Sequence, residues 1–78
     1  MVIHTQDNKQ LLSEHVSELG IAAKLEEEYS VFAVLKQGSS IILGDYVDLE
    51  EAKEAMKSLI RAWNHDSFHC MPEKGFFG

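Results

Sequence analysis

The feature that most constrains the fold is a pair of short apolar runs separated by a turn signal. The first run covers 31–35 (VFAVL), the second covers 41–43 (IIL), and the polar segment 37–40 (QGSS) lies between them. β-Branched and aromatic residues favour strands, and a short polar connection with glycine favours a hairpin. A strand with one wet face alternates polar and apolar residues. The continuous run at 31–35 therefore predicts a central strand, or one covered by the C-terminal tail.

The segment 49–63 has the clearest helical pattern in the chain. Asp48 is a suitable N-cap, and Glu51 three residues later completes a capping box. Acidic residues in the first turns, with Lys57 and Arg61 near the end, follow the polarity that the helix dipole favours. The apolar positions recur at helical spacing at Leu49, Ala52, Met56, Leu59, Ile60 and Trp63. We predict a helix over 49–63.

A first helix is predicted over 7–19. Asp7 is a suitable N-cap with Gln10 three residues on, and Gly20 suits the left-handed position after a helix. The apolar residues with helical spacing in this segment are Leu11, Leu12, Val16 and Leu19. These positions would form one stripe facing the core.

The segment 21–26 is compatible with a strand, because its residues alternate, and with a helix, because they are good helix formers. We favour a strand, since Gly20 has just ended a helix and an isolated two-stranded hairpin is weak. The expected fold class is α+β: a small antiparallel sheet of two or three strands in a meander, packed against two helices. The expected order is α-β-β-β-α.

The length of 78 residues allows one domain, 1–78, with 65–78 as an apolar C-terminal tail. The tail carries Phe68, Met71, Phe76 and Phe77. Burying each such side chain contributes roughly 1.5–3 kcal/mol, which matters in a small domain. We therefore expect part of the tail to pack over the sheet or against Trp63. If it does not, its aromatics form a docking patch for another chain.

The bulk composition narrows the partners. A net charge of −6 disfavours nucleic acid and anionic membranes, which attract clustered lysine and arginine. No apolar run approaches the roughly 18 residues of a membrane helix, and the first residues lack the pattern of a secretion signal. The single cysteine, Cys70, allows no internal disulfide. We expect a cytoplasmic protein without a membrane partner.

No motif indicates catalysis, a metal or a cofactor. His65, His69 and Cys70 lie close together in sequence, but a zinc site commonly needs four ligands and no second pair is visible. A cysteine nucleophile needs an electropositive setting and a histidine base, for which adjacent side chains are poorly placed. The glycines at 38 and 44 belong to no phosphate-binding pattern. We expect a protein that is not an enzyme and that holds no cofactor or metal.

The expected α-β-β-β-α order resembles that of the double-stranded RNA-binding domain, with the resemblance carried by the segment from Tyr29 to Ala62. It has a strand, a turn, a strand ending at Gly44, and a helix containing Ala52-Lys53. That family places basic residues at the start of its last helix, where they meet phosphate. Here the position reads Asp48-Leu49-Glu50-Glu51 and would repel phosphate. A degenerate nucleic-acid binder of this type is one alternative function, without assigned RNA contacts.

An antiparallel meander brings the ends of its first and third strands to the same rim. Two acidic clusters distant in sequence would converge there, beside the start of the second helix. This acidic rim consists of Glu26, Glu27, Glu28, Asp45, Asp48, Glu50, Glu51 and Glu54. Its simplest interpretation is a solvated rim, since exposed charges are usually just that.

The functional interpretation is a non-enzymatic protein-interaction module, an adaptor or inhibitor, whose acidic rim binds a basic surface of another protein. Mimicry of nucleic acid, as practised by inhibitors from phages and mobile elements, is one form of it. The alternative is a homodimeric interaction or structural domain that docks through apolar contacts. Its docking residues would be Trp63, Phe68, Phe76 and Phe77. Both monomer and homodimer remain open.

Overall fold

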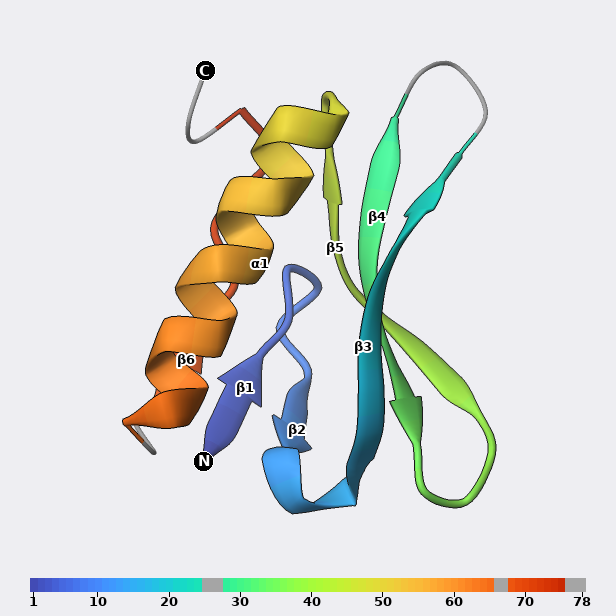
Figure 1. Cartoon of the computed structure of the whole chain (residues 1–78), viewed down its shortest axis with the longest axis vertical. Helices are drawn as coiled ribbons and strands as arrows, with labels where there is room; N and C mark the ends of the chain where they lie inside the picture. Colours follow the sequence, from blue (N-terminus) through green and yellow to red (C-terminus); the bar gives the residue numbers. More distant parts are fainter. Residues whose placement is uncertain (25–27, 66–67, 76–78) are drawn as a thin grey trace.

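The computed structural model describes residues 1–24, 28–65 and 68–75. Within these residues the chain forms two three-stranded sheets and one α-helix (Figure 1). In chain order the elements are β1 (Val2–His4), β2 (Gln10–Leu12), the 3-10 turn η1 (Ser13–His15), β3 (Val16–Ala23), β4 (Tyr29–Leu35), β5 (Ser40–Tyr46), α1 (Leu49–Asn64) and β6 (His69–Cys70).

The larger sheet is an antiparallel meander in the order β3-β4-β5. The β4–β5 hairpin turns at Gly38, whose φ of 107° is a conformation that glycine adopts without strain. β4 lies between its two neighbours, which confirms the central strand predicted from the apolar run. Ile21–Ala23 belong to β3, so this part of the predicted strand at 21–26 is also confirmed.

The smaller sheet joins the two ends of the chain. β1 pairs antiparallel with β2 and parallel with β6, so that Ile3 lies between Leu11 and His69. Met71, directly after β6, is buried in the core. The described part of the tail packs onto the domain by adding a strand beside β1, whereas the sequence expectation was packing over the sheet or against Trp63. Phe76 and Phe77 lie outside the described residues.

The predicted helix over 7–19 is wrong. The segment forms β2, η1 and the first part of β3 instead. Leu11 is buried while Leu12 is exposed, so alternation along a strand, not a helical stripe, determines their environment. Gly20 lies in the middle of β3, and Asp7 accepts a hydrogen bond from the Thr5 hydroxyl within a turn. Four apolar residues over this length fit two short strands as well as one helix.

The expected α-β-β-β-α order is corrected accordingly. The described chain has six strands in two sheets and a single helix that follows five of them. The resemblance to the double-stranded RNA-binding domain loses its first helix, because that segment is strand. What remains of it is a hairpin followed by a helix, an arrangement too general to indicate RNA binding.

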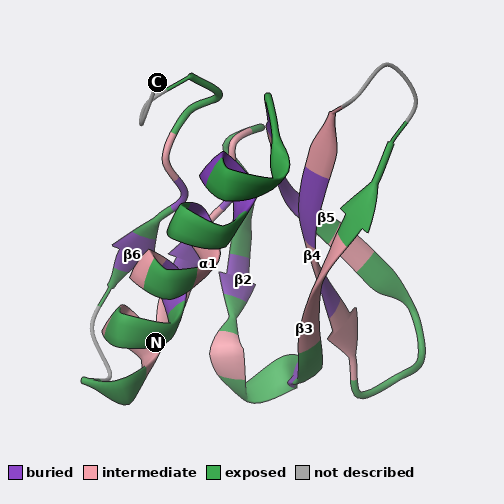
Figure 2. Cartoon of the chain, turned by 45° about the horizontal axis from the view of Figure 1, so that its top comes forward, coloured by how far each residue is buried: buried purple, intermediate pink, exposed green. Residues whose placement is uncertain are grey.

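The helix predicted at 49–63 is confirmed at Leu49–Asn64. The Asp48 carboxylate accepts a hydrogen bond from Glu51 N at 2.8 Å, as an N-cap should. The buried Glu51 carboxylate accepts from Val47 N at 3.1 Å, one residue before the N-cap. α1 packs against β4 and β5 through its buried side, which includes Ala52, Ala55 and Leu59 (Figure 2).

Candidate interaction surface

The two ends of the acidic rim meet in space, but lysines lie between them. Ser30 and Asp45 are opposite each other on β4 and β5, and the Ser30 hydroxyl donates to the Asp45 carboxylate at 2.6 Å. Lys24 Nζ lies 3.2 Å from the same carboxylate. This hydrogen bond and the lysine hold the pKa of Asp45 below its usual range. Glu28 forms an ion pair with Lys74 in the tail.

The helical members of the acidic rim have local roles. Asp48 caps α1, and Glu51 is buried and also accepts from Gly75 N at 2.9 Å. Glu50 and Glu54 are exposed, each within ion-pair range of a lysine three residues later. Glu26 and Glu27 lie outside the described residues. The sequence interpretation missed the lysines, because Lys24 and Lys74 reach the rim only through the tertiary fold.

The aromatic residues of the docking alternative lie in different environments. Trp63 is half-buried and packs against the core, whereas Phe68 is 61% exposed. The Phe68 ring lies against the His4 ring with a centroid distance of 4.6 Å. Phe76 and Phe77 lie outside the described residues.

A different apolar surface lies on the outer side of the meander. Side chains alternate along β4, so Val31 and Ala33 are buried in the core while Phe32 and Val34 point to the opposite face. The strand register places Phe32 between Gly20 of β3 and Ile42 of β5. We call this surface the meander face. It consists of Gly20, Ala22, Phe32, Val34 and Ile42.

The meander face is apolar and partly exposed. The Phe32 ring lies over Gly20 so closely that a Cβ there would be 2.5 Å from Phe32 Cζ. Ile42 beside it is 51% exposed. Among the described elements, α1 and the smaller sheet lie on the other side of the meander (Figure 1). The sequence interpretation recognised that both faces of β4 are apolar, but expected the second one to be covered.

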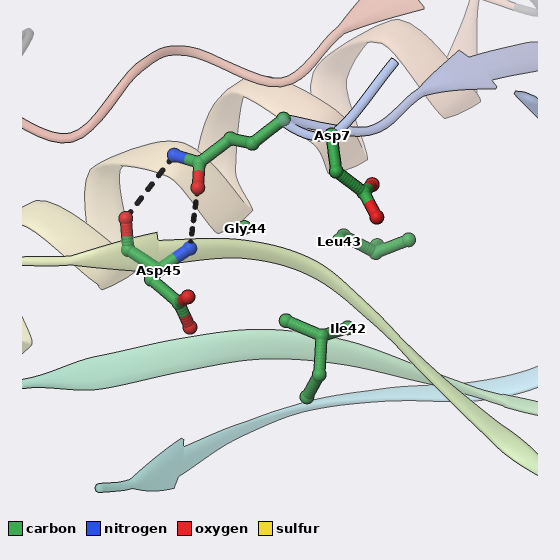
Figure 3. Close-up of a pocket in the computed structure, with 6 residues that line it drawn as sticks. Asp7, Ile42, Leu43, Gly44 and Asp45 are labelled. Atoms are coloured by element: carbon green, nitrogen blue, oxygen red, sulfur yellow. Dashed lines mark hydrogen bonds between the residues drawn. The ribbon is translucent and has the colours of Figure 1, made fainter. Parts of the chain in front are cut away.

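A small pocket lies at the edge of β5 and shares Ile42 with the meander face. Its volume is about 220 Å³, and its lining residues are Gln6, Asp7, Ile42, Leu43, Gly44 and Asp45. Sites for drug-sized ligands usually measure roughly 300–1,000 Å³. Two hydrogen bonds to the backbone of Asp45 cross it (Figure 3). The pocket is better described as the place where Gln6 covers a strand edge.

Gln6 uses its backbone and side chain to cover β5. Its N–H donates to Leu43 O at 3.0 Å, its Oε1 accepts from Asp45 N at 2.7 Å, and its Nε2 donates to Asp45 O at 3.1 Å. Nε2 also donates to Pro72 O at 2.8 Å. A Cβ on Gly44 would lie 2.9 Å from Gln6 Cδ, so glycine is needed for this approach. Nothing in the sequence around Gln6 indicates its role.

The histidines and the cysteine do not converge. His69 and Cys70 are successive residues of β6 and point to opposite sides, with His69 buried and Cys70 exposed. His69 Nε2 has no hydrogen-bond partner among the described residues, and burial lowers the pKa of its imidazole. His65 ends α1. Over residues 1–24, 28–65 and 68–75, no three residues among His, Cys, Asp and Glu gather as metal ligands would.

Two further findings bear on function. In the described part of the chain, no helix has the length and apolarity needed to cross a membrane. No protein-family model, no curated protein and no solved structure matches this chain.

Proposed function

We propose that this chain is a non-enzymatic protein-interaction module that binds another protein through the meander face. The observation that carries the proposal is the group formed by half-buried Phe32, half-buried Val34 and exposed Ile42, on a sheet whose other side already forms the core. Contiguous apolar side chains that remain partly exposed on a small domain are typical of interaction sites. The flat ring of Phe32 over Gly20 offers a rigid aromatic anchor, the kind of residue that dominates binding energies.

The partner surface that fits is apolar with a basic border. Glu18 lies beside Val34 at one end of the meander face, and the chain as a whole carries a net charge of −6. Apolar burial would supply most of the affinity, at roughly 25 cal/mol per Å². The acidic charge would favour encounter with lysine- and arginine-rich surfaces. The basic partner expected from the sequence is thus retained, with contact centred on the meander face and not on the acidic rim.

A charged side chain in the meander face tests the proposal. Ile42→Lys leaves the core intact, because Ile42 is half-exposed and points away from it. Ile60→Lys on α1 is the matched control, the same change at a position that is 45% exposed. Proteins captured from the native host by the three forms would be quantified by mass spectrometry. We expect a basic-surfaced protein to be retained by the wild type and by Ile60→Lys, and lost with Ile42→Lys. Equal capture by all three forms would refute the proposal.

A second candidate function is binding by charge alone, as an inhibitor that mimics nucleic acid. The observation that favours it is the net charge of −6 on so short a chain. Salt distinguishes the two modes, since raising the ionic strength to about 1 M shortens the Debye length to roughly 3 Å. Binding that disappears at this salt concentration, and that is unaffected by Ile42→Lys, would favour charge mimicry.

A further inference from the structure

Along β3, the backbone N–H and C=O groups of successive residues point alternately toward β4 and toward the outer edge of the sheet. Lys24 N donates to Glu28 O at 2.7 Å, which makes this pair one of the hydrogen-bonded pairs of the β3–β4 ladder. Such pairs alternate along an antiparallel ladder. Ala22, Gly20 and Glu18 therefore bond to β4, while the N–H and C=O groups of the intervening residues point away from the sheet. These outward residues are Leu19, Ile21 and Ala23.

The outward groups of β3 meet no other described segment. Among residues 1–24, 28–65 and 68–75, no hydrogen bond joins Leu19, Ile21 or Ala23 to a residue beyond the β3–β4 ladder. The stretch from Leu19 to Ala23 has no charge and no proline, the usual devices that protect an exposed edge. An unprotected edge of this kind is a template for an additional strand.

The sequence of β3 is complementary to itself in one register. If two copies pair antiparallel about a two-fold axis at Ile21, Ile21 faces Ile21 and Leu19 faces Ala23. All three outward residues then lie in hydrogen-bonded pairs between the two copies, as the direction of their N–H and C=O groups requires. The non-hydrogen-bonded pairs place Gly20 opposite Ala22, two small residues that leave room for the Phe32 rings beside them.

The same register pairs opposite charges. Glu18 of each copy lies opposite Lys24 of the other, at a non-hydrogen-bonded pair, where facing side chains are closest. Both side chains are exposed. Lys24 already contacts Asp45, so it would lie between two carboxylates in the pair of copies. A shift by two residues would lose this match.

We propose that two copies of this chain associate through the outer edges of their β3 strands, antiparallel about a two-fold axis at Ile21, to form one continuous sheet. This inference goes beyond the proposed function, because it uses the edge of the meander and not its face. The contact between the two strands buries less surface than a standard protein–protein interface, which buries about 1,200–2,000 Å² in total. The dimer is therefore reversible. Pairing also joins the two meander faces into one larger surface.

A charge exchange tests the register. Glu18→Lys places lysine opposite lysine in the dimer, and Lys24→Glu places glutamate opposite glutamate, so each variant should repel itself. In an equimolar mixture, one copy of each variant regains two opposite-charge pairs. Sedimentation velocity would follow each sample from about 1 µM to 1 mM. Glu54→Lys on α1 is the control for a change of net charge, and circular dichroism verifies that every variant is folded.

We expect the wild type and Glu54→Lys to dimerise with concentration. The dissociation constant should rise by roughly tenfold or more for each edge variant alone, and the mixture should restore the dimer. A wild type that stays monomeric throughout would overturn the inference. So would edge variants that dimerise as the wild type does, or a mixture that remains monomeric. Ile42→Lys should still dimerise, which separates failure of this inference from failure of the proposed function.

Discussion

The two edges of the meander differ in how their backbone groups are satisfied. At β5, Gln6 bonds to Leu43 and Asp45 with both its backbone and its side chain. At β3, the outward groups of Leu19, Ile21 and Ala23 meet no described segment. One edge is completed within the chain and the other is left open. The difference shows that the fold is able to cover an edge, and it identifies β3 as the edge available to a second chain.

Coverage of the β5 edge depends on the C-terminal tail. Pro72 O accepts from Gln6 Nε2 at 2.8 Å and from the Tyr46 hydroxyl at 2.9 Å. Met71 N donates to His4 O at 2.9 Å and extends the pairing of β6 with β1. Burial, with the nearby Glu51, raises the pKa of Tyr46 well above its usual range, so its hydroxyl remains a donor. The covered edge therefore joins both ends of the chain to the meander.

Removing the amide that covers the β5 edge should have the largest effect on stability. Gln6→Ala deletes three side-chain hydrogen bonds and leaves the backbone groups of Asp45 without these partners. We expect the free energy of unfolding to fall by about 1–3 kcal/mol, measured by urea denaturation. That is a large part of the roughly 4–12 kcal/mol typical for a chain of this length. Gln10→Ala, at an exposed position of β2, is the control. Equal midpoints for the two variants would show that Gln6 contributes nothing at this edge.

Loss of a single hydrogen bond next to β5 should lower the free energy of unfolding by less than Gln6→Ala does. Asp48→Ala removes the N-cap of α1, two residues after β5 ends. The expected loss is about 0.5–2 kcal/mol, smaller than for Gln6→Ala because only one hydrogen bond is lost. Asp48→Asn should retain most of the stability, since asparagine caps nearly as well. A thermal midpoint for Asp48→Ala equal to that of the wild type would contradict the capping role.

The sequence was sufficient where local signals and tertiary structure agree. The hairpin follows from two apolar runs around Gly38, and α1 follows from Asp48 and a helical apolar stripe. The segment 7–19 was misread because helical and strand spacing both accommodate Leu11 and Val16. The decisive factor was pairing with distant strands, 16–23 with 29–35 and 10–12 with 2–4. Such pairing is a tertiary effect that overrides local propensity.

The meander face could be predicted only in part from the sequence. Alternation along β4 does place Phe32 and Val34 on the second face, and this was visible in the sequence. Which face stays open depends on where α1 and the tail pack, and the sequence expectation placed the tail over the second face. The acidic rim was predicted from topology alone. The lysines that neutralise Asp45 and Glu28 come from positions 24 and 74, and only the folded chain brings them there.

Acidification should destabilise the covered edge at β5 before it affects the edge at β3. His69 is 8% exposed, its Nε2 meets no hydrogen-bond partner in the described part of the chain, and burial lowers its pKa from the usual 6.5. The unfolded chain therefore takes up this proton at a higher pH than the folded chain. Stability should be constant well above pH 6.5 and should fall as the pH drops through 6.5 towards the lower pKa of the folded state. Asp45, whose pKa lies below 3.8, affects stability only at lower pH.

Urea denaturation between about pH 8 and pH 5 measures this dependence. His69→Gln, which cannot take up a proton in this range, should remove much of the slope. Because His69 belongs to β6, hydrogen exchange at mildly acidic pH should accelerate first at Asp45 N and Met71 N, while Gly20 N stays protected by β4. Equal slopes for the wild type and His69→Gln would show that protonation of His69 does not control the tail.

The smallest effect on the folded monomer is expected at the open edge. Ala23→Pro removes an N–H that points away from the sheet, and proline is tolerated at such positions of edge strands. The free energy of unfolding measured at low protein concentration should change by no more than about 0.5 kcal/mol. Ala22→Pro is the matched control, because its N–H bonds to β4 opposite Ser30, and it should cost at least about 1 kcal/mol. Dimerisation should nevertheless weaken with Ala23→Pro, since each copy loses one donor to the other. If Ala23→Pro destabilises the monomer as much as Ala22→Pro, the N–H of Ala23 does not point away from the sheet. The two-fold register at Ile21 would then also be wrong.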